Sequence, residues 1–242
     1  MFEVETRGGV TRLQRGQTRW LSTGWNGGES VGERAYNVTV PEGWPTVEID
    51  AYLADRLSEA GFEGDGPALL TGVDQRHARL ARLGPVTALA TAGLSNPATV
   101  PLDPKPARSD VGAPEDGDRP PGTVNLFVGT AHACVGGSLP GLVATAVEAK
   151  TATLLAETGF TGTTSDALVV ACDPDGEPVE YVGSATGVGT AVRACVREAL
   201  LASLRSRYAD GGYPESVAAA EYGVETRERA VVEKVRGTEP GK

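Results

Sequence analysis

Cysteine and histidine are both scarce in this chain of 242 residues. The three cysteines, Cys134, Cys172 and Cys195, form no CxxC pair and stand in apolar runs, which indicates reduced core thiols rather than a disulfide framework. The two histidines are His77 and His132, whereas a hydrolytic zinc site normally needs two or three on one site. We therefore expect no metal site and no cofactor.

Long apolar runs and basic clusters are absent from the sequence as well. No apolar run approaches the ~18 residues of a membrane span, and the N-terminus does not resemble a signal peptide, so we expect a cytoplasmic protein. The 32 acidic and 22 basic residues give a net charge of −10. That charge disfavours nucleic acid and anionic membranes as partners, and a homo-oligomer remains compatible with the sequence.

Lysine is the scarcest of the charged residues. It supplies only 4 of the 22 basic residues, and arginine supplies the other 18. An excess of acid together with little lysine is typical of cytoplasmic proteins from salt-loving microbes. The composition therefore predicts a source among salt-loving microbes.

One domain is expected over residues 1–242, because the length suits one sizeable core and no long linker divides the chain. Strand-like and helix-like segments alternate for most of the length. We predict an α/β fold with a single layered domain, a mixed β-sheet, helices packed on its faces, and antiparallel edge strands from both termini. The expected strands lie within 1–23 and at 36–40, 67–71, 86–92, 123–128, 167–172, 179–182 and 222–235, and the expected helices at 46–60, 143–158 and 190–207.

Residues 101–121 differ in composition from the rest of the chain. They hold six of the 16 prolines together with five acidic residues. Such a segment cannot bury enough apolar area to adopt one packed conformation. We expect an exposed loop that is rich in proline and acid.

The stretch from Val143 to Cys172 contains a helix, a polar turn and a buried strand in succession. Gly159 is the natural end of the helix. Within the helix, Glu148 and Lys150 are separated by ~200° and therefore serve different faces, and a charge on the packed face needs a partner. Asp166 lies at the mouth of the strand. These three groups are candidates for proton transfer or, alternatively, a solvated charge and a structural ion pair.

Asparagine occurs only four times, each time in or beside a turn or strand end. Its side-chain amide both donates and accepts hydrogen bonds, which suits recognition of carboxamides or stabilisation of an oxyanion. The alternative is that each asparagine only allows left-handed backbone or caps a helix. The candidate substrate-binding residues are Asn26, Asn37, Asn96 and Asn125, together with Thr164 and Ser165 of the central turn.

Hydroxyl groups are the candidate nucleophiles. Ser95 follows the strand at 86–92, and the central turn offers Thr163, Thr164 and Ser165. Ser95 matches the G-x-S-x-G elbow only in part, because proline stands in place of the last glycine. The glycine loop 183–189 precedes a helix and has anion-binding N–H groups, but it lacks the P-loop lysine, so a tight turn explains it equally well.

Five segments are more specific in combination than any one of them: Leu21-Ser-Thr-Gly with Asn26-Gly-Gly, Thr91-Ala-Gly-Leu-Ser-Asn-Pro97, Gly122-Thr-Val-Asn125, Glu148-Ala-Lys-Thr-Ala152 and Thr164-Ser-Asp-Ala-Leu-Val-Val-Ala171. Over residues 20–207 they resemble the adenosylcobinamide amidohydrolase family, CbiZ. The resemblance implies hydrolysis of the amide that joins the aminopropanol arm to the corrin ring of adenosylcobinamide. The product would be adenosylcobyric acid for cobalamin (vitamin B12) salvage in prokaryotes, and the cobalt corrinoid would be substrate rather than cofactor.

For such a reaction we predict that Glu148, Lys150, Asp166 and Ser95 converge on one catalytic site with Asn96. Ser95 or a water molecule would attack the carbonyl, Asn96 would hold the oxyanion, and a carboxyl group would protonate the leaving amine. The alternative is a non-catalytic corrinoid-binding protein, which needs the same apolar and amide-binding surface but no nucleophile. A phosphate-ester enzyme built on the glycine loop is a third hypothesis.

The dependence of stability on salt tests the composition argument. If the acid-rich surface is adapted to molar salt, its carboxylates repel one another in dilute salt and lower the stability of the fold. We expect the melting temperature to rise by several degrees between about 0.1 and 2 M KCl. An unchanged melting temperature in a KCl titration would contradict the predicted adaptation.

Overall fold

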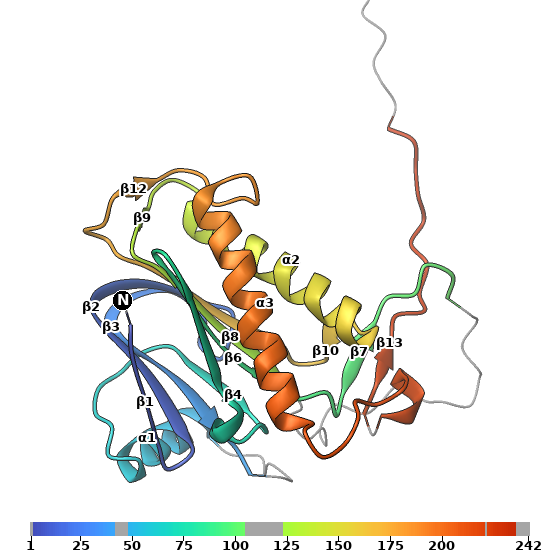
Figure 1. The fold of residues 1–242 in the computed structure, drawn as a ribbon, viewed down its shortest axis with the longest axis horizontal. Helices are drawn as coiled ribbons and strands as arrows, with labels where there is room; N and C mark the ends of the chain where they lie inside the picture. The colour runs from blue at the N-terminus through green and yellow to red at the C-terminus, as the bar shows by residue number, and fades with distance from the viewer. Residues whose placement is uncertain (1, 42–47, 105–122, 221, 236–242) are drawn as a thin grey trace, which may run out of the picture.

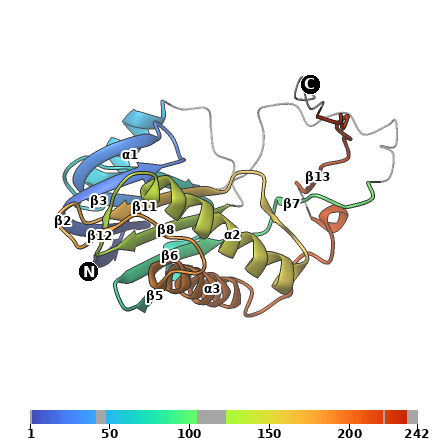
Figure 2. The ribbon, with the colours of Figure 1, turned by 90° about the horizontal axis from the view of Figure 1, so that it is seen from above.

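The computed structural model describes residues 2–41, 48–104, 123–220 and 222–235. Most of the loop predicted at 101–121 therefore lies outside the described residues. A mixed β-sheet forms the centre of the molecule, and two long helices run side by side across one of its faces (Figures 1 and 2). The α/β class with a mixed sheet, predicted from the sequence, is confirmed.

Eight strands make up the large sheet: β1 (Glu3–Arg7), β2 (Val10–Ser22), β3 (Gly28–Thr39), β4 (Ala68–Thr71), β5 (Arg79–Leu83), β6 (Val86–Ala92), β8 (Val124–Thr130) and β11 (Ala167–Cys172). Their order is β4-β3-β2-β11-β8-β6-β5, and β1 pairs with β2 beside this path. The pairs β3–β4 and β8–β11 are parallel, whereas the other neighbours are antiparallel. The path thus ends at β4 and β5, and β1 is a further edge strand because β2 is its only partner.

Two small sheets accompany the large one. The first contains β10 (Gly162–Thr163), β7 (Pro97–Thr99) and β13 (Val224–Glu225), and the second contains β9 (Ala133–Cys134) and β12 (Pro178–Val179). The edge strand predicted at 222–235 is therefore wrong for most of its length. Only Val224–Glu225 form a strand, and they pair parallel with β7 rather than antiparallel at the large sheet. Residues 226–235 are exposed, so their alternating pattern has no core to face.

Three α-helices are present in the described part of the chain: α1 (Ile49–Glu59), α2 (Ser138–Thr158) and α3 (Gly187–Arg207). Short 3₁₀ helices lie at Gln75–His77 and Val217–Ala219. Helix α2 begins five residues before the predicted start and includes Pro140 in its first turn. Proline is tolerated there because the N–H groups of the first turn have no partner within the helix. It ends as predicted at Gly159, which has a left-handed φ of 77°. No described helix is both long and apolar enough to cross a lipid bilayer.

The central strands are buried on both faces, and their side chains alternate between two layers of the core. The layer under α2 and α3 contains Val86, Ala88, Ala90, Ala92, Val124, Leu126, Val128, Leu168, Val170 and Cys172. In the opposite layer, Leu89, Phe127 and Val169 pack with Phe2 and Trp20, whose rings lie 5.5 Å apart. The strand predicted at 167–172 is therefore confirmed as buried on both faces. All three cysteines are free and buried, as expected.

The sheet curls so that strand β4 comes to face β8. The side-chain amide of Asn125 in β8 donates to the carbonyl oxygen of Leu70 in β4 at 3.0 Å, and the hydroxyl of Thr123 donates to that of Thr71 at 2.6 Å. Helix α1 covers a third apolar cluster that includes Tyr36. The curl thus brings polar side chains of distant strands together at one end of the sheet.

Gly129 offers a test of the layer that holds the N-terminal strand. A Cβ atom at Gly129 would lie 2.1 Å from the ring of Phe2, so Gly129→Ala must push that ring out of its place. Overpacking of this kind costs ~1–3 kcal/mol, which should lower the melting temperature by roughly 5 °C. The matched control is Gly16→Ala, because a Cβ atom at Gly16 meets nothing within 4 Å. Equal melting temperatures of the two variants would contradict the packing of Phe2.

Candidate functional site

Lys150 and Asp166 form a buried ion pair. The ammonium group of Lys150, on helix α2, donates to Oδ2 of Asp166, which stands directly before strand β11. Only 11% of the Lys150 side chain and 17% of the Asp166 side chain are exposed. Lys150 therefore lies on the packed face of the helix, and Asp166 is the partner that a buried charge requires.

The second oxygen of Asp166 is held by the polar turn. Oδ1 accepts from the backbone N–H and the hydroxyl of Thr163 and from the backbone N–H of Val124 at the start of β8. Gly162 allows this arrangement, because a Cβ atom there would lie 2.5 Å from Asp166 Oδ2 and 2.9 Å from Lys150 Nζ. Asp166 thus joins helix α2, the turn and strand β8 through one carboxylate.

Asn96 binds the same turn from the other side. Its side-chain amide donates to the hydroxyl of Thr164 at 2.6 Å and to that of Ser165 at 3.4 Å. The backbone N–H of Thr164 returns a bond to the carbonyl oxygen of Asn96 at 3.1 Å. The other side-chain atom, Asn96 Oδ1, is buried and has no partner among the described residues. An unpartnered buried carbonyl is a place where a ligand N–H gains a hydrogen bond.

A cavity of about 440 Å³ opens above these groups. Four of the predicted site residues line it: Asn96, Thr164, Ser165 and Asp166. The other lining residues were not predicted as site residues, although Thr23, Gly24, Thr123 and Ala167 stand in the segments that carry the family resemblance. These additional residues are Thr23, Gly24, Trp25, Ala68, Leu69, Leu70, Thr123 and Ala167.

A layer of side-chain amides is buried behind the cavity. Asn125 donates to Asn37 Oδ1 at 2.8 Å, and the amide of Asn37 donates in turn to Gln75 at 3.2 Å and to Thr91 at 3.0 Å. Asn37 and Asn125 are fully buried, and neither is among the residues that line the cavity. The structure therefore gives these two asparagines a role in holding the curled strands together, and Asn125 Oδ1 is left without a partner in the described part of the chain.

The remaining predicted site residues lie elsewhere. Glu148 pairs with Arg193 of helix α3 on the side of α2 away from Lys150, and 59% of its side chain is exposed. Ser95 is partly exposed, and its backbone carbonyl accepts a hydrogen bond from the N–H of Tyr222. Asn26 has a left-handed φ of 47° and donates to the carboxylate of Asp50 at 3.1 Å. The structure thus brings Lys150, Asp166 and Asn96 together and leaves Glu148 and Ser95 outside the cavity wall.

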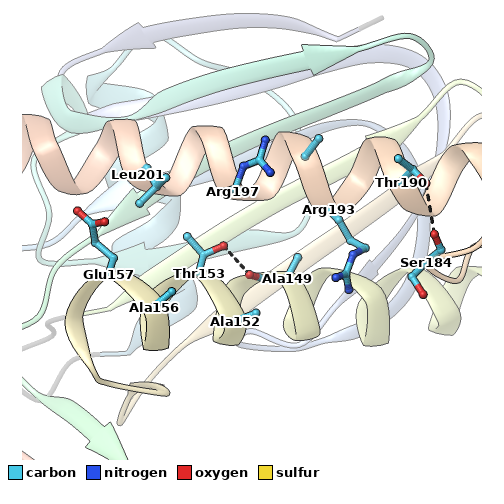
Figure 3. Close-up of a pocket in the computed structure, with 11 residues that line it drawn as sticks. Ala149, Ala152, Thr153, Ala156, Glu157, Ser184, Thr190, Arg193, Arg197 and Leu201 are labelled. Atoms are coloured by element: carbon cyan, nitrogen blue, oxygen red, sulfur yellow. Dashed lines mark hydrogen bonds between the residues drawn. The ribbon is translucent and has the colours of Figure 1, made fainter.

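A larger cavity of about 530 Å³ lies between helices α2 and α3 (Figure 3). Alanines of α2 face Arg193 and Arg197 of α3 across it. Both arginines are already paired, with Glu148 and Glu198 respectively. The 440 Å³ cavity is the better candidate site, because its wall combines the carboxylate of Asp166, which Lys150 pairs from behind, with the hydroxyls of Thr164 and Ser165 and with Asn96, whose Oδ1 has no partner among the described residues.

The histidines do not contribute to this site. His77 is buried, and its Nδ1 lies 2.9 Å from the hydroxyl of Ser206. Burial lowers the pKa of this imidazole below its usual value, with help from neighbouring arginines. The described residues contain no group of three or more histidine, cysteine or acidic side chains arranged to hold a metal ion.

Residues 3–212 match the family of adenosylcobinamide amidohydrolases, CbiZ. The adenosylcobinamide amidohydrolase of Halobacterium salinarum is 55% identical over 235 residues, covering 96% of this chain and 99% of the relative. This chain belongs to the adenosylcobinamide amidohydrolase family. A second CbiZ relative, from Methanosarcina mazei, is 28% identical over 208 residues, covering 81% of this chain and 95% of its own length.

Membership of CbiZ confirms the resemblance found in the sequence. A halophilic archaeon is the source of the first relative, in agreement with the composition. Among solved structures, the PH0078 protein of Pyrococcus horikoshii OT3 is similar at 14% identity with a TM-score of 0.38, covering 84% of this chain and 78% of its own.

Because the pair is buried, removing one of its charges should destabilise the protein more than removing both. Asp166→Asn leaves the Lys150 ammonium buried without its counter-charge, and breaking a buried pair in this way costs ~3–5 kcal/mol, or roughly 10 °C in melting temperature. The double variant Lys150→Met with Asp166→Asn removes both charges and should recover much of that loss. Scanning calorimetry compares the two.

The matched control is the exposed pair of Glu148 with Arg193. Glu148→Gln should change the free energy of unfolding by no more than ~1 kcal/mol, since surface ion pairs contribute little. A double variant at positions 150 and 166 that melts no higher than Asp166→Asn would contradict the assignment of a buried charge pair.

Proposed function

We propose that this chain hydrolyses the amide that joins the aminopropanol arm to the corrin ring of adenosylcobinamide. The products are adenosylcobyric acid and free aminopropanol, and the corrinoid is the small-molecule partner of a cytoplasmic enzyme in cobalamin salvage. The observation that carries the proposal is 55% identity to an adenosylcobinamide amidohydrolase across nearly the whole of both chains.

The cavity above Asp166 is the site that we assign to this reaction. It combines a carboxylate with the amide and hydroxyl groups of Asn96, Thr164 and Ser165. Its floor is rigid, because the carboxylate is held by Lys150 and by three further donors. Catalytic groups must be held within a fraction of an ångström of the reacting bond, and a carboxylate fixed by four hydrogen bonds meets that requirement.

Asp166 is the general base in this proposal. Each carboxylate oxygen carries two lone pairs; Oδ1 shares its own among three hydrogen bonds, whereas Oδ2 accepts only that of Lys150. The open position on Oδ2 can therefore receive the proton of a water molecule as its oxygen attacks the amide carbon. Asp166 then returns that proton to the leaving nitrogen as the C–N bond breaks.

Asn96 and Thr164 stabilise the charge that develops on the carbonyl oxygen. The amide of Asn96 donates to the hydroxyl oxygen of Thr164, so the hydroxyl hydrogen of Thr164 is free to donate into the cavity. Asn96 Oδ1 lacks a partner in the described structure and would accept the N–H of the scissile amide. Donors aimed at a developing oxyanion are commonly the largest contribution to such a reaction.

Lys150 acts through Asp166 in this mechanism. Its ammonium group holds the carboxylate in one orientation through the bond to Oδ2. No step of the proposal uses a metal ion, so the reaction should proceed in the presence of a chelator. The protein residues alone supply base, oxyanion donors and orientation.

The variants Asp166→Asn and Glu148→Gln test the proposed chemistry as a matched, nearly isosteric pair. Asp166→Asn removes the base and should lower turnover of adenosylcobinamide about a hundredfold, the usual size of an acid–base contribution. Glu148→Gln changes an exposed group paired with Arg193 and should leave turnover near the parent value. Adenosylcobyric acid and aminopropanol are quantified by chromatography in molar KCl with EDTA present.

Stability must be separated from chemistry in this assay, since Asp166 also holds the fold. Turnover is therefore normalised to the folded fraction, and the charge-free Lys150→Met, Asp166→Asn double variant is assayed beside the single one. Full activity of the folded Asp166→Asn enzyme would show that Asp166 is structural. Loss of the parent activity in EDTA, restored by zinc, would contradict the metal-free mechanism, and binding without product would favour a non-catalytic corrinoid carrier.

A further inference from the structure

A second cavity of about 360 Å³ adjoins the one above Asp166. The two share Trp25 and Ala68 in their walls, so that the indole ring stands at the boundary between them. We infer that this second cavity, the Trp25 cavity, is the subsite for the adenosyl group of the substrate. The inference rests on the proposed function and assigns a substrate group to residues outside the reaction site.

Trp25 is held in place by a network of its own. The indole N–H donates to Asp50 Oδ1 at 2.8 Å, and Asn26 donates to the same oxygen at 3.1 Å. The ring therefore cannot rotate freely, although 50% of the residue is exposed. A large aromatic face that is both oriented and open to a cavity suits stacking against a planar base. Asn26, which we predicted to bind substrate, lines the same cavity and shares Asp50 with the indole.

The polar lining of the Trp25 cavity selects the chemistry of its ligand. Three carboxylates line it, from Glu29, Asp50 and Asp65, and Ser30 adds a hydroxyl. These groups accept hydrogen bonds from the amino group of adenine and the hydroxyls of ribose, whereas they repel phosphate. The adenosyl ligand of a corrinoid is an uncharged nucleoside without phosphate. The acidic lining therefore suits this ligand and opposes a nucleotide.

The arrangement of the two cavities matches that of the two substrate groups. In adenosylcobinamide the aminopropanol arm leaves the edge of the corrin ring, and the adenosyl group stands on the cobalt at the centre. A protein that holds this edge must therefore provide adjoining sites for the amide and the nucleoside. With the amide above Asp166, the edge of the ring lies across Trp25 and the adenosyl group enters the Trp25 cavity.

Comparing two corrinoids in the full-length protein tests this assignment. Adenosylcobinamide and dicyanocobinamide carry the same aminopropanol amide and differ in their axial ligands. Dissociation constants are measured in the dark by equilibrium dialysis, read by corrin absorbance, beside kcat/KM for hydrolysis of each compound. Trp25→Leu should weaken adenosylcobinamide binding about tenfold, within the range of base–aromatic stacking, and leave dicyanocobinamide within about twofold. Trp25→Phe keeps an aromatic face and should lose less.

The control variant is Tyr181→Leu, since Tyr181 is 76% exposed and lines neither cavity. Equal weakening of both corrinoids by Trp25→Leu would overturn the inference, because the indole would then contact only the shared ring. No change for either corrinoid would overturn it too. The proposed function is judged separately: if Trp25→Leu weakens only adenosylcobinamide but the parent protein releases no aminopropanol from either compound, hydrolysis fails while the adenosyl subsite stands.

Discussion

The ion pair of Lys150 and Asp166 is the interaction on which the candidate site depends. Helix α2 supplies the ammonium group, and the turn before β11 supplies the carboxylate, which also receives the first backbone N–H of β8. A buried charge pair is a weak source of net stability, because desolvation offsets much of the attraction. Its value here lies in geometry: neither charge can leave without exposing the other to an apolar interior, so helix, turn and strand keep one relative position.

The curl of the sheet provides the second constraint. Strand β4 reaches over β8 only because the amides of Asn37 and Asn125 and the hydroxyl of Thr91 satisfy one another in the gap. Hydrogen bonds between buried polar groups of distant strands fix those strands relative to one another, although Asn125 Oδ1 has no partner among the described residues. The cavity wall built from Ala68, Leu69 and Leu70 is therefore rigid through contacts that lie behind it.

Local features of the chain were predictable from its residues. Gly159 ends helix α2, and the apolar run at 167–172 is a strand buried on both faces, because both depend on neighbours in sequence. Helical spacing also separated Glu148 from Lys150, yet only the structure shows that Lys150 faces Asp166 whereas Glu148 faces helix α3. Asn37 and Asn125 stand 88 residues apart, and their pairing depends on the curl of the sheet, which no local pattern encodes. The prediction of a strand at 222–235 was wrong for most of its length for the same reason: an alternating sequence forms a strand only where a partner strand is available.

Strand β5 forms one edge of the large sheet, where a strand of another chain could pair with it. An edge strand offers unpaired N–H and C=O groups to any neighbouring chain, and charged side chains along it discourage such pairing. Arg79 and Arg82 stand on β5, and each is anchored within the molecule, to the hydroxyl of Ser206 at 2.5 Å and to the carbonyl oxygen of Phe2 at 2.9 Å. Molar salt screens free surface charges, but arginines fixed by hydrogen bonds still obstruct the edge sterically. Protection of the β5 edge against pairing with another chain therefore does not depend on net charge alone, because these two anchored side chains occupy the edge at any salt concentration.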